Sequence, residues 1–224
     1  MNPEPGGTPA EKPLLRGWSH LLAAVGFPFA ALYLILQTHT TAELVYVGVY
    51  AICMEALFLV SALLHRIHWE EVGRRRMRRA DHSTIFLAIA GSYTAVAGLS
   101  LTGTNRLTIL IAAWAGSAVG IAIRNLWLDA PKWANTIPYV VVGWCALLEI
   151  GPLAHALGGW GLFWMFAGGL AYTVGAVAYG AKRPNLVPGV FGYHELFHAG
   201  TIVGATCHYV VILCFALPVA ERLA

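Results

Sequence analysis

The sequence predicts an all-α integral membrane bundle of seven transmembrane helices, with the N-terminus inside and the C-terminus outside. Of the 224 residues, 58% are hydrophobic and only 11% are charged, and the mean hydropathy is +0.66. A soluble domain is typically about 45–50% apolar and about 25% charged. The chain also contains seven apolar stretches close to the roughly 20 residues that a helix needs to cross a bilayer. These observations argue against a soluble enzyme, a nucleic-acid-binding protein and a disordered chain.

The predicted elements follow directly from the apolar stretches. Residues 1–15 are polar and rich in Pro and Gly, and they predict a disordered cytoplasmic tail. Residues 16–224 form the predicted seven-helix transmembrane domain. Backbone groups inside a bilayer must be satisfied internally, which favours helices over open strands. We expect helices at 18–36, 45–65, 82–102, 107–126, 136–157, 161–181 and 197–218.

The basic residues set the predicted orientation, because Lys and Arg concentrate in cytoplasmic segments. With the N-terminus inside, twelve of the fourteen basic residues lie in inner segments, and the exceptions are Arg106 and Arg222. The run GRRRMRR at 73–79 is interpreted as a topology anchor, with binding of anionic lipid head groups as the alternative. No aromatic residues interleave with this run, so we expect no nucleic-acid partner.

Ionisable residues gather at three predicted helix ends on the inner face. His65 ends the second helix, Asp81 and His82 open the third, and His194 and His198 open the seventh. Ionisable residues inside a membrane are costly and commonly mark a functional site. This layer is therefore the predicted site of the chemistry.

The pattern at this layer is typical of a metal site. His194 and His198 are four residues apart, so their rings share a helix face at a spacing that suits two ligands of one ion. A third histidine from another helix would complete a three-histidine site with an open position for water, as in catalytic zinc enzymes. Asp81 could hold or deprotonate that water. Ser61, one turn from His65, could hydrogen-bond a ligand or the substrate.

A second interpretation concerns the segment HELFH at 194–198. It fits the HExxH pattern of zinc proteases, in which Glu195 would be the general base. An intramembrane metalloprotease would also need a carboxylate ligand on another helix, often in an Asp-Gly pair, and the sequence contains no such pair. Asp81 is the only aspartate at a predicted helix, and it sits at the membrane edge.

Three motifs resemble those of the haemolysin III family, a bacterial branch of the progestin and adipoQ receptor (PAQR) family that includes adiponectin receptors. SALLH at 61–65 is similar to the family's SxxxH, and DHSTIF at 81–86 is similar to its DHSxIF. FGYHELFHAGTIVGATCHY at 191–209 resembles HExxH followed by CHY. The resemblance covers about residues 16–218. Ala95 departs from it, because the family often has a proline there.

The resemblance implies Zn2+ bound by His65, His194 and His198. It implies that Asp81 contacts the water at the zinc and that Ser61 has a supporting or catalytic role. It also implies a zinc-dependent, ceramidase-like hydrolase of lipid amides or esters in a bacterial inner membrane, with membrane lipids as partners. Two alternatives stay open, namely a sensor or receptor with structural zinc and a membrane-lytic protein.

Several polar residues have no assigned role at this stage. His68 lies three residues after His65, one turn nearer the cytoplasm, and is an alternative ligand. His65 is preferred because of its spacing from Ser61 and its match to the family pattern. His208 is fourteen residues beyond His194, about 21 Å along a helix, and is too distant for the same metal ion. The open residues are His20, Glu55, His68, Glu149 and His208.

Overall fold

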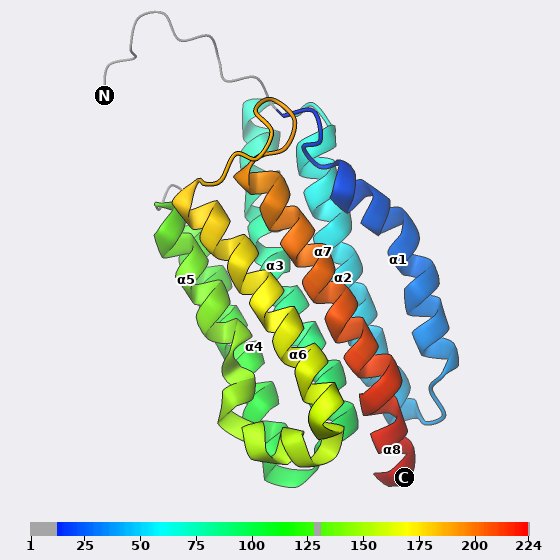
Figure 1. Cartoon of the computed structure of the whole chain (residues 1–224). Coiled ribbons are helices and arrows are strands. Elements are labelled where there is room, and N and C mark those ends of the chain that lie inside the picture. The colour runs from blue at the N-terminus through cyan, green and yellow to red at the C-terminus, as the bar shows by residue number, and fades with distance from the viewer. Residues whose placement is uncertain (1–12, 128–130, 224) are drawn as a thin grey trace, which may run out of the picture.

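The computed structural model describes residues 13–127 and 131–223, which form one helical bundle (Figure 1). Apart from a β-bridge between Val187 and Phe191, the regular structure of the described residues is helical. Residues 1–12 of the predicted tail lie outside the part of the chain that the structure describes. The elements are α1 Trp18–Leu36, α2 Thr41–Arg66, α3 Glu71–Ser100, α4 Gly103–Leu126, α5 Lys132–Gly143, the 3₁₀ helix η1 Cys145–Glu149, α6 Ile150–Ala181, α7 Tyr193–Val211, the π-helix η2 Ile212–Ala216 and α8 Leu217–Leu223.

Six helical segments among the described residues are long and apolar enough to cross a membrane. Four of them are α1, α2, α3 and α4, and another is the continuous run from α7 to α8. The remaining segment, Thr136–Ala181, has 46 residues and contains the fifth and sixth predicted helices. The all-α class and the membrane-spanning character of the prediction are therefore confirmed.

The predicted helix over 136–157 is wrong in its middle, because the chain bends there. α5 ends at Gly143, whose carbonyl accepts a hydrogen bond of 2.6 Å from the hydroxyl of Tyr93. The same hydroxyl accepts the backbone N–H of Ala146 at 3.1 Å. One side chain of α3 thus satisfies two backbone groups where the helix is interrupted. A second break at Gly158 (φ 67°) lets the rest of α6 run back beside α5 (Figure 1).

Several helices begin earlier than predicted, and the shifts of α3 and α7 affect the site. α3 starts at Glu71 rather than at residue 82, so the arginine-rich run is helical, in keeping with the good helix propensity of arginine. α7 starts at Tyr193 because the side chain of Glu195 accepts the N–H of Gly192 at 2.9 Å and caps the first turn. The early start of α7 places the predicted metal ligands inside regular helix.

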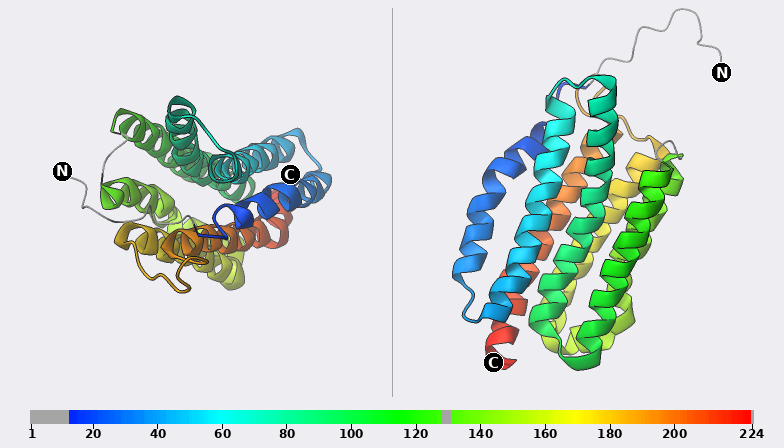
Figure 2. Two further views of the ribbon diagram at one scale, coloured as in Figure 1. Left: turned by 90° about the horizontal axis from the view of Figure 1, so that it is seen from above. Right: turned by 180° about the vertical axis from the view of Figure 1, so that it is seen from behind.

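The polar residues of interest lie at one end of the bundle. The starts of α1, α3, α5 and α7 and the ends of α2, α4 and α6 meet there, and α8 ends at the opposite end (Figures 1 and 2). We call it the upper end, as it is uppermost in Figure 1. The N–H of Leu14 donates to the carbonyl of Gly189 at 3.0 Å, which ties the chain before α1 to the loop before α7.

Close packing of α2 against α3 holds two helices of this layer in register. A Cβ atom at Gly91 of α3 would lie 2.7 Å from the Cβ of Cys53 and 3.4 Å from the carbonyl oxygen of Val49, both on α2. Small residues let membrane helices approach closely and pack by van der Waals contact. Gly91 therefore permits the contact that aligns the two helices.

We predict that Gly91→Ala lowers the free energy of unfolding by about 1–3 kcal/mol, because the added methyl group forces the helices apart. The matched control is Gly48→Ala in α2, where a Cβ meets nothing within 4 Å. This control should be neutral or slightly stabilising, since alanine is the better helix former. Thermal unfolding of the purified protein in detergent measures both. Equal melting temperatures for the two variants would contradict the prediction.

Candidate metal centre

Three histidines from two helices converge at the upper end of the bundle. His65 lies in the last turn of α2, and His194 and His198 lie in the first two turns of α7. One ring nitrogen from each lies within 4.8 Å of the others. The ring centroids of His194 and His198 are 4.7 Å apart, and that of His65 lies 4.8 Å from the first and 5.2 Å from the second. The three imidazoles thus form one compact cluster.

The donor set of this cluster fits zinc. Imidazole nitrogen binds zinc at about 2.0–2.1 Å, so the ligands of a tetrahedral ion lie roughly 3.3–3.5 Å from one another. Nitrogens within 4.8 Å of each other need only small ring rotations to reach this geometry. Three histidines would leave the fourth position open, as catalytic zinc sites do.

Asp81 and Ser61 lie beside the cluster. Ser61 is buried on α2, one turn before His65, and its hydroxyl lies near the carboxylate of Asp81 on α3. Both residues line the same cavity as His194 and His198. The structure therefore brings His65, His194 and His198 together, and it places Ser61 and Asp81 on the wall of a cavity that His194 and His198 also line.

His20 of α1 is a fourth histidine in this layer, and the sequence alone left it without a role. Its ring stacks on the ring of His198 with centroids 4.0 Å apart and planes inclined by 8°. Phe58 packs edge-on against it at 5.4 Å, and His20 is only 1% exposed. This stacking restricts rotation of the His198 ring and thereby orients its nitrogens. The predicted depth of His20, at the inner start of the first helix, was the signal that could have found it.

A buried arginine and two tyrosines complete the polar layer. Arg124, in the last turn of α4, is 5% exposed. It donates to the carbonyl oxygen of Trp127 at 3.2 Å, and its charge lies near Tyr139 of α5 and Asp81. The ring of Tyr179 on α6 lies 5.2 Å from the ring of His194. The sequence reasoning missed all three. Arg124 resembled an ordinary topology marker, and the tyrosines carried no motif.

Glu195, the second residue of HExxH, has a structural role. One carboxylate oxygen pairs with the guanidinium of Arg16, and the other accepts the N–H of Gly192. Glu195 is 3% exposed. A general base must reach the proton that it abstracts, whereas both oxygens here are already engaged by Arg16 and Gly192. This arrangement favours a zinc site without Glu195 over the protease interpretation of HELFH.

The remaining open residues lie outside the cluster. His68 is exposed in the segment after α2, so the geometry favours His65 as the ligand. A ring nitrogen of His208 lies 3.3 Å from the carbonyl oxygen of Met165, far along α7. One carboxylate oxygen of Glu55 is buried without a hydrogen-bond partner among the described residues. Glu149 is half-buried at the end of η1.

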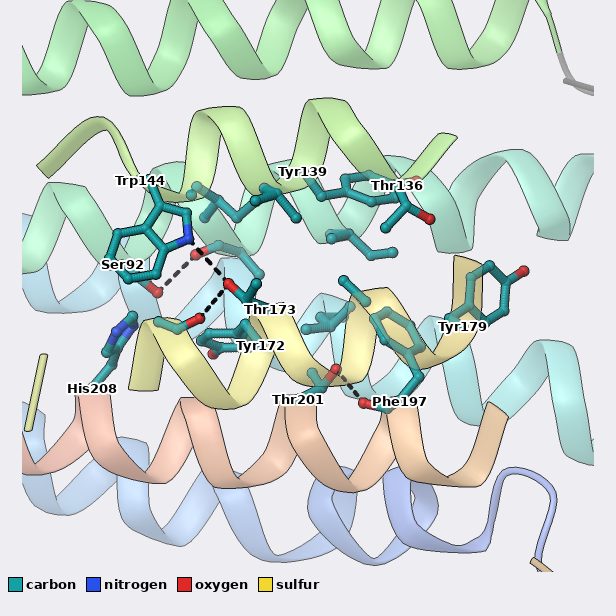
Figure 3. A pocket seen from close by; sticks show the side chains of 18 of the residues that line it. Ser92, Thr136, Tyr139, Trp144, Tyr172, Thr173, Tyr179, Phe197, Thr201 and His208 are labelled. Carbon is teal, nitrogen blue, oxygen red and sulfur yellow. Dashed lines mark hydrogen bonds between the residues drawn. The ribbon is translucent and has the colours of Figure 1, made fainter. Parts of the chain in front are cut away.

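A narrow cavity of about 120 Å³ runs from this polar layer into the bundle (Figure 3). Tyr179 lies at one end of the view, and Trp144 and His208 lie at the other. Both His198 and His208 line the cavity, and their separation on α7 corresponds to roughly 15 Å at 1.5 Å per residue. Polar groups at the far end have internal partners, such as the Trp144 indole, which donates to the hydroxyl of Thr173 at 3.0 Å. The cavity is therefore long, slender and mostly apolar.

We predict that Glu195→Gln lowers the free energy of unfolding by about 1–3 kcal/mol, because the charge that faces Arg16 is lost while an amide oxygen can still cap α7. Zinc content should not change. The matched control is Glu71→Gln, which removes an exposed pair with Arg75 and should cost about 1 kcal/mol or less. Thermal unfolding and elemental analysis measure both quantities. Loss of zinc with an unchanged melting temperature would instead assign Glu195 to the metal centre.

Comparison with known proteins agrees with this architecture. The family described as "Haemolysin-III related" matches residues 9–209. "Hemolysin-3" of Bacillus cereus is 31% identical over 182 residues, which cover 81% of this chain and 80% of that protein. The "Monocyte to macrophage differentiation factor" of Homo sapiens is 24% identical and covers 73% of this chain and 67% of that protein. The "ADIPOR-like receptor IZH2" of Saccharomyces cerevisiae is 42% identical over 52 residues, 21% of this chain and 16% of that protein. The chain therefore belongs to the haemolysin III family and is related to the wider PAQR proteins.

Proposed function

We propose that this chain is a zinc-dependent membrane hydrolase that cleaves lipid amides or esters. One observation carries the proposal, namely that three imidazoles converge in the polar layer, where Ser61 and Asp81 line an apolar cavity together with His194 and His198. A carbonyl substrate whose apolar chain fills the cavity would have its polar group at this cluster. Ligand pockets commonly combine an apolar lining with a few convergent polar groups.

His65, His194 and His198 would hold the zinc ion, and His20 would keep the ring of His198 in its binding orientation. Zinc in such a site supplies a Lewis acid that polarises a carbonyl group and lowers the pKa of water to about 7. The residues around a metal ligand commonly fix its ring orientation and tune its affinity. His20 would fix the orientation of the His198 ring by stacking against its face.

Asp81 is the proposed general base and acid. It takes a proton from the water that attacks the carbonyl carbon, and it returns the proton to the amine or alcohol as the bond to carbon breaks. Ser61, which is buried beside it, would orient the carboxylate by donating a hydrogen bond. The mostly apolar surroundings would strengthen the electrostatic interactions in the site.

The slender cavity supports a substrate with one unbranched apolar chain. Its 120 Å³ extend along α7 from the level of His198 to that of His208, which suits a chain better than a compact ring system. Membrane lipids meet this description, and they reach the site within the bilayer. We therefore propose that membrane lipids are the substrates.

We also propose seven crossings, with the upper end facing the cytoplasm of a bacterial cell. The breaks after Gly143 and at Gly158 support two crossings within Thr136–Ala181, because α5 and α6 lie side by side. The positive-inside rule supports the orientation. Most described basic residues lie at the upper end, whereas Arg106 begins α4 at the opposite end.

We predict that the purified wild-type protein contains about one zinc ion per chain, and that His65→Ala and His194→Ala lose most of it. His68→Ala and His208→Ala are matched controls, because these histidines lie outside the cluster, and both should retain zinc. Elemental analysis of protein purified in detergent measures the content. Unchanged zinc in both cluster variants would exclude this site.

We predict that Asp81→Asn slows hydrolysis roughly 100- to 10,000-fold, the usual contribution of general acid–base catalysis, while zinc stays bound. The assay uses the zinc-loaded protein with a panel of ceramide-like amides and long-chain esters, and it measures release of the fatty acid. Ser61→Ala should have a smaller effect in the same direction. A zinc-loaded protein that hydrolyses no member of the panel would count against the hydrolase.

The second proposal is a non-enzymatic sensor or receptor in which zinc is structural. The observation that favours it is that Asp81 lines the same cavity as two of the histidines and could be a fourth ligand. Structural zinc sites have four protein ligands, and the carboxylate of Asp81 would be the fourth. Loss of zinc in Asp81→Asn would support this reading, whereas retention supports the hydrolase. A membrane-lytic role is a weaker proposal that rests on the name of the Bacillus relative, and leakage of vesicles without zinc would support it.

A further inference from the structure

A second concave site lies on the outer surface of the upper end, apart from the histidine cluster. The groove has a volume of about 550 Å³. It lies between the first turns of α3 and the end of α4, and it shares no lining residue with the apolar cavity. The residues that line it are Glu71, Arg74, Arg75, Arg78, Arg79, Leu126 and Trp127.

The groove concentrates positive charge. Four arginines and one glutamate line it, and Glu71 is paired with Arg75 at 3.0 Å. Arg75 and Arg79 are four residues apart on one helix, as are Arg74 and Arg78, and like charges at this spacing repel each other. The positive end of the α3 dipole adds to this field. A bound anion would relieve the repulsion.

Three arginines outside the groove have partners within the protein. Arg16 pairs with Glu195, Arg66 stacks over the ring of Trp18 at 4.2 Å, and Arg106 donates to the hydroxyl of Tyr46 at 3.2 Å. Among the described residues that line the groove, there are four arginines and one glutamate. The net positive charge of this lining attracts an anion.

The opposite wall of the groove is apolar. Leu126 is 88% exposed and Trp127 is 56% exposed, and Val72, beside Glu71, is also exposed. Tryptophan is enriched where a membrane meets water, because its ring is amphipathic. A free phosphate ion would leave these side chains in water, whereas a phospholipid would cover them with its glycerol and first chain carbons.

We propose that this groove binds the phosphate-bearing head group of an anionic membrane phospholipid. The guanidinium groups donate to the phosphate oxygens, which arginine can do in a bidentate manner. Leu126 and Trp127 contact the apolar part of the lipid. Basic pockets between transmembrane helices are known to hold such head groups. The inference needs the chain to lie in a membrane, but it does not depend on zinc or on hydrolysis.

Native mass spectrometry of the full-length protein in a neutral detergent tests the proposal, because single lipid adducts are counted without a charged bilayer. We expect phosphatidylglycerol to bind and phosphatidylcholine to bind much more weakly. The double variant Arg74→Gln/Arg79→Gln should weaken binding of phosphatidylglycerol roughly 10- to 30-fold, from the loss of two arginines near the lipid surface. Arg79→Gln alone should show a smaller loss.

The matched control is Lys182→Gln/Arg183→Gln, which removes two exposed charges at the same end of the bundle. It should change binding less than twofold. Equal losses in the control and the groove variant would overturn the site, as would equal binding of phosphatidylcholine. Melting temperatures in neutral detergent check that each variant is folded.

A further experiment distinguishes binding of a lipid from binding of a free anion. Trp127→Ala should weaken binding of phosphatidylglycerol while leaving any binding of inorganic phosphate unchanged. Inorganic phosphate should displace the lipid only at a large excess. If phosphate displaces the lipid at equal concentration and Trp127→Ala has no effect, the groove is a site for free anions and the lipid proposal is wrong.

Discussion

The ion pair between Arg16 and Glu195 determines how the upper end of the bundle is assembled. It joins the chain before α1 to the first turn of α7, and the second oxygen of the same carboxylate caps Gly192. The Glu195 side of this pair is buried, so removing Arg16 would leave a buried charge without its partner. The pair joins the start of α1 to α7, close to where His20 stacks on His198.

Helix α3 contributes polar residues to three different parts of the protein. The first turns of α3 carry the arginines of the outer groove. Asp81 then lines the cavity that His194 and His198 also line, and the hydroxyl of Tyr93, further along, bonds the backbone at the break after α5. The close contact at Gly91 fixes this helix against α2. A single shift of α3 would consequently disturb the groove, the carboxylate and the bend.

Sequence reasoning recovered the helical class and most helix positions because each apolar stretch is a local signal. It also predicted that His65, His194 and His198 share one layer with Asp81, since helix ends place them at one depth, and the three histidines do converge. It failed at 136–157, where composition predicts one continuous helix. The side chain of Tyr93, fifty residues earlier, satisfies the backbone at the break, and no local pattern reports such a contact.

The sequence by itself determined the membrane class, the layer of ionisable residues and the helical spacing of two histidines, because hydropathy and periodicity are properties of neighbouring residues. Only the tertiary structure decided which residues meet in that layer. It added His20, Arg124 and Tyr139, and it engaged Glu195 in an ion pair. These outcomes depend on which helix faces which, and that is set by packing between segments far apart in the chain.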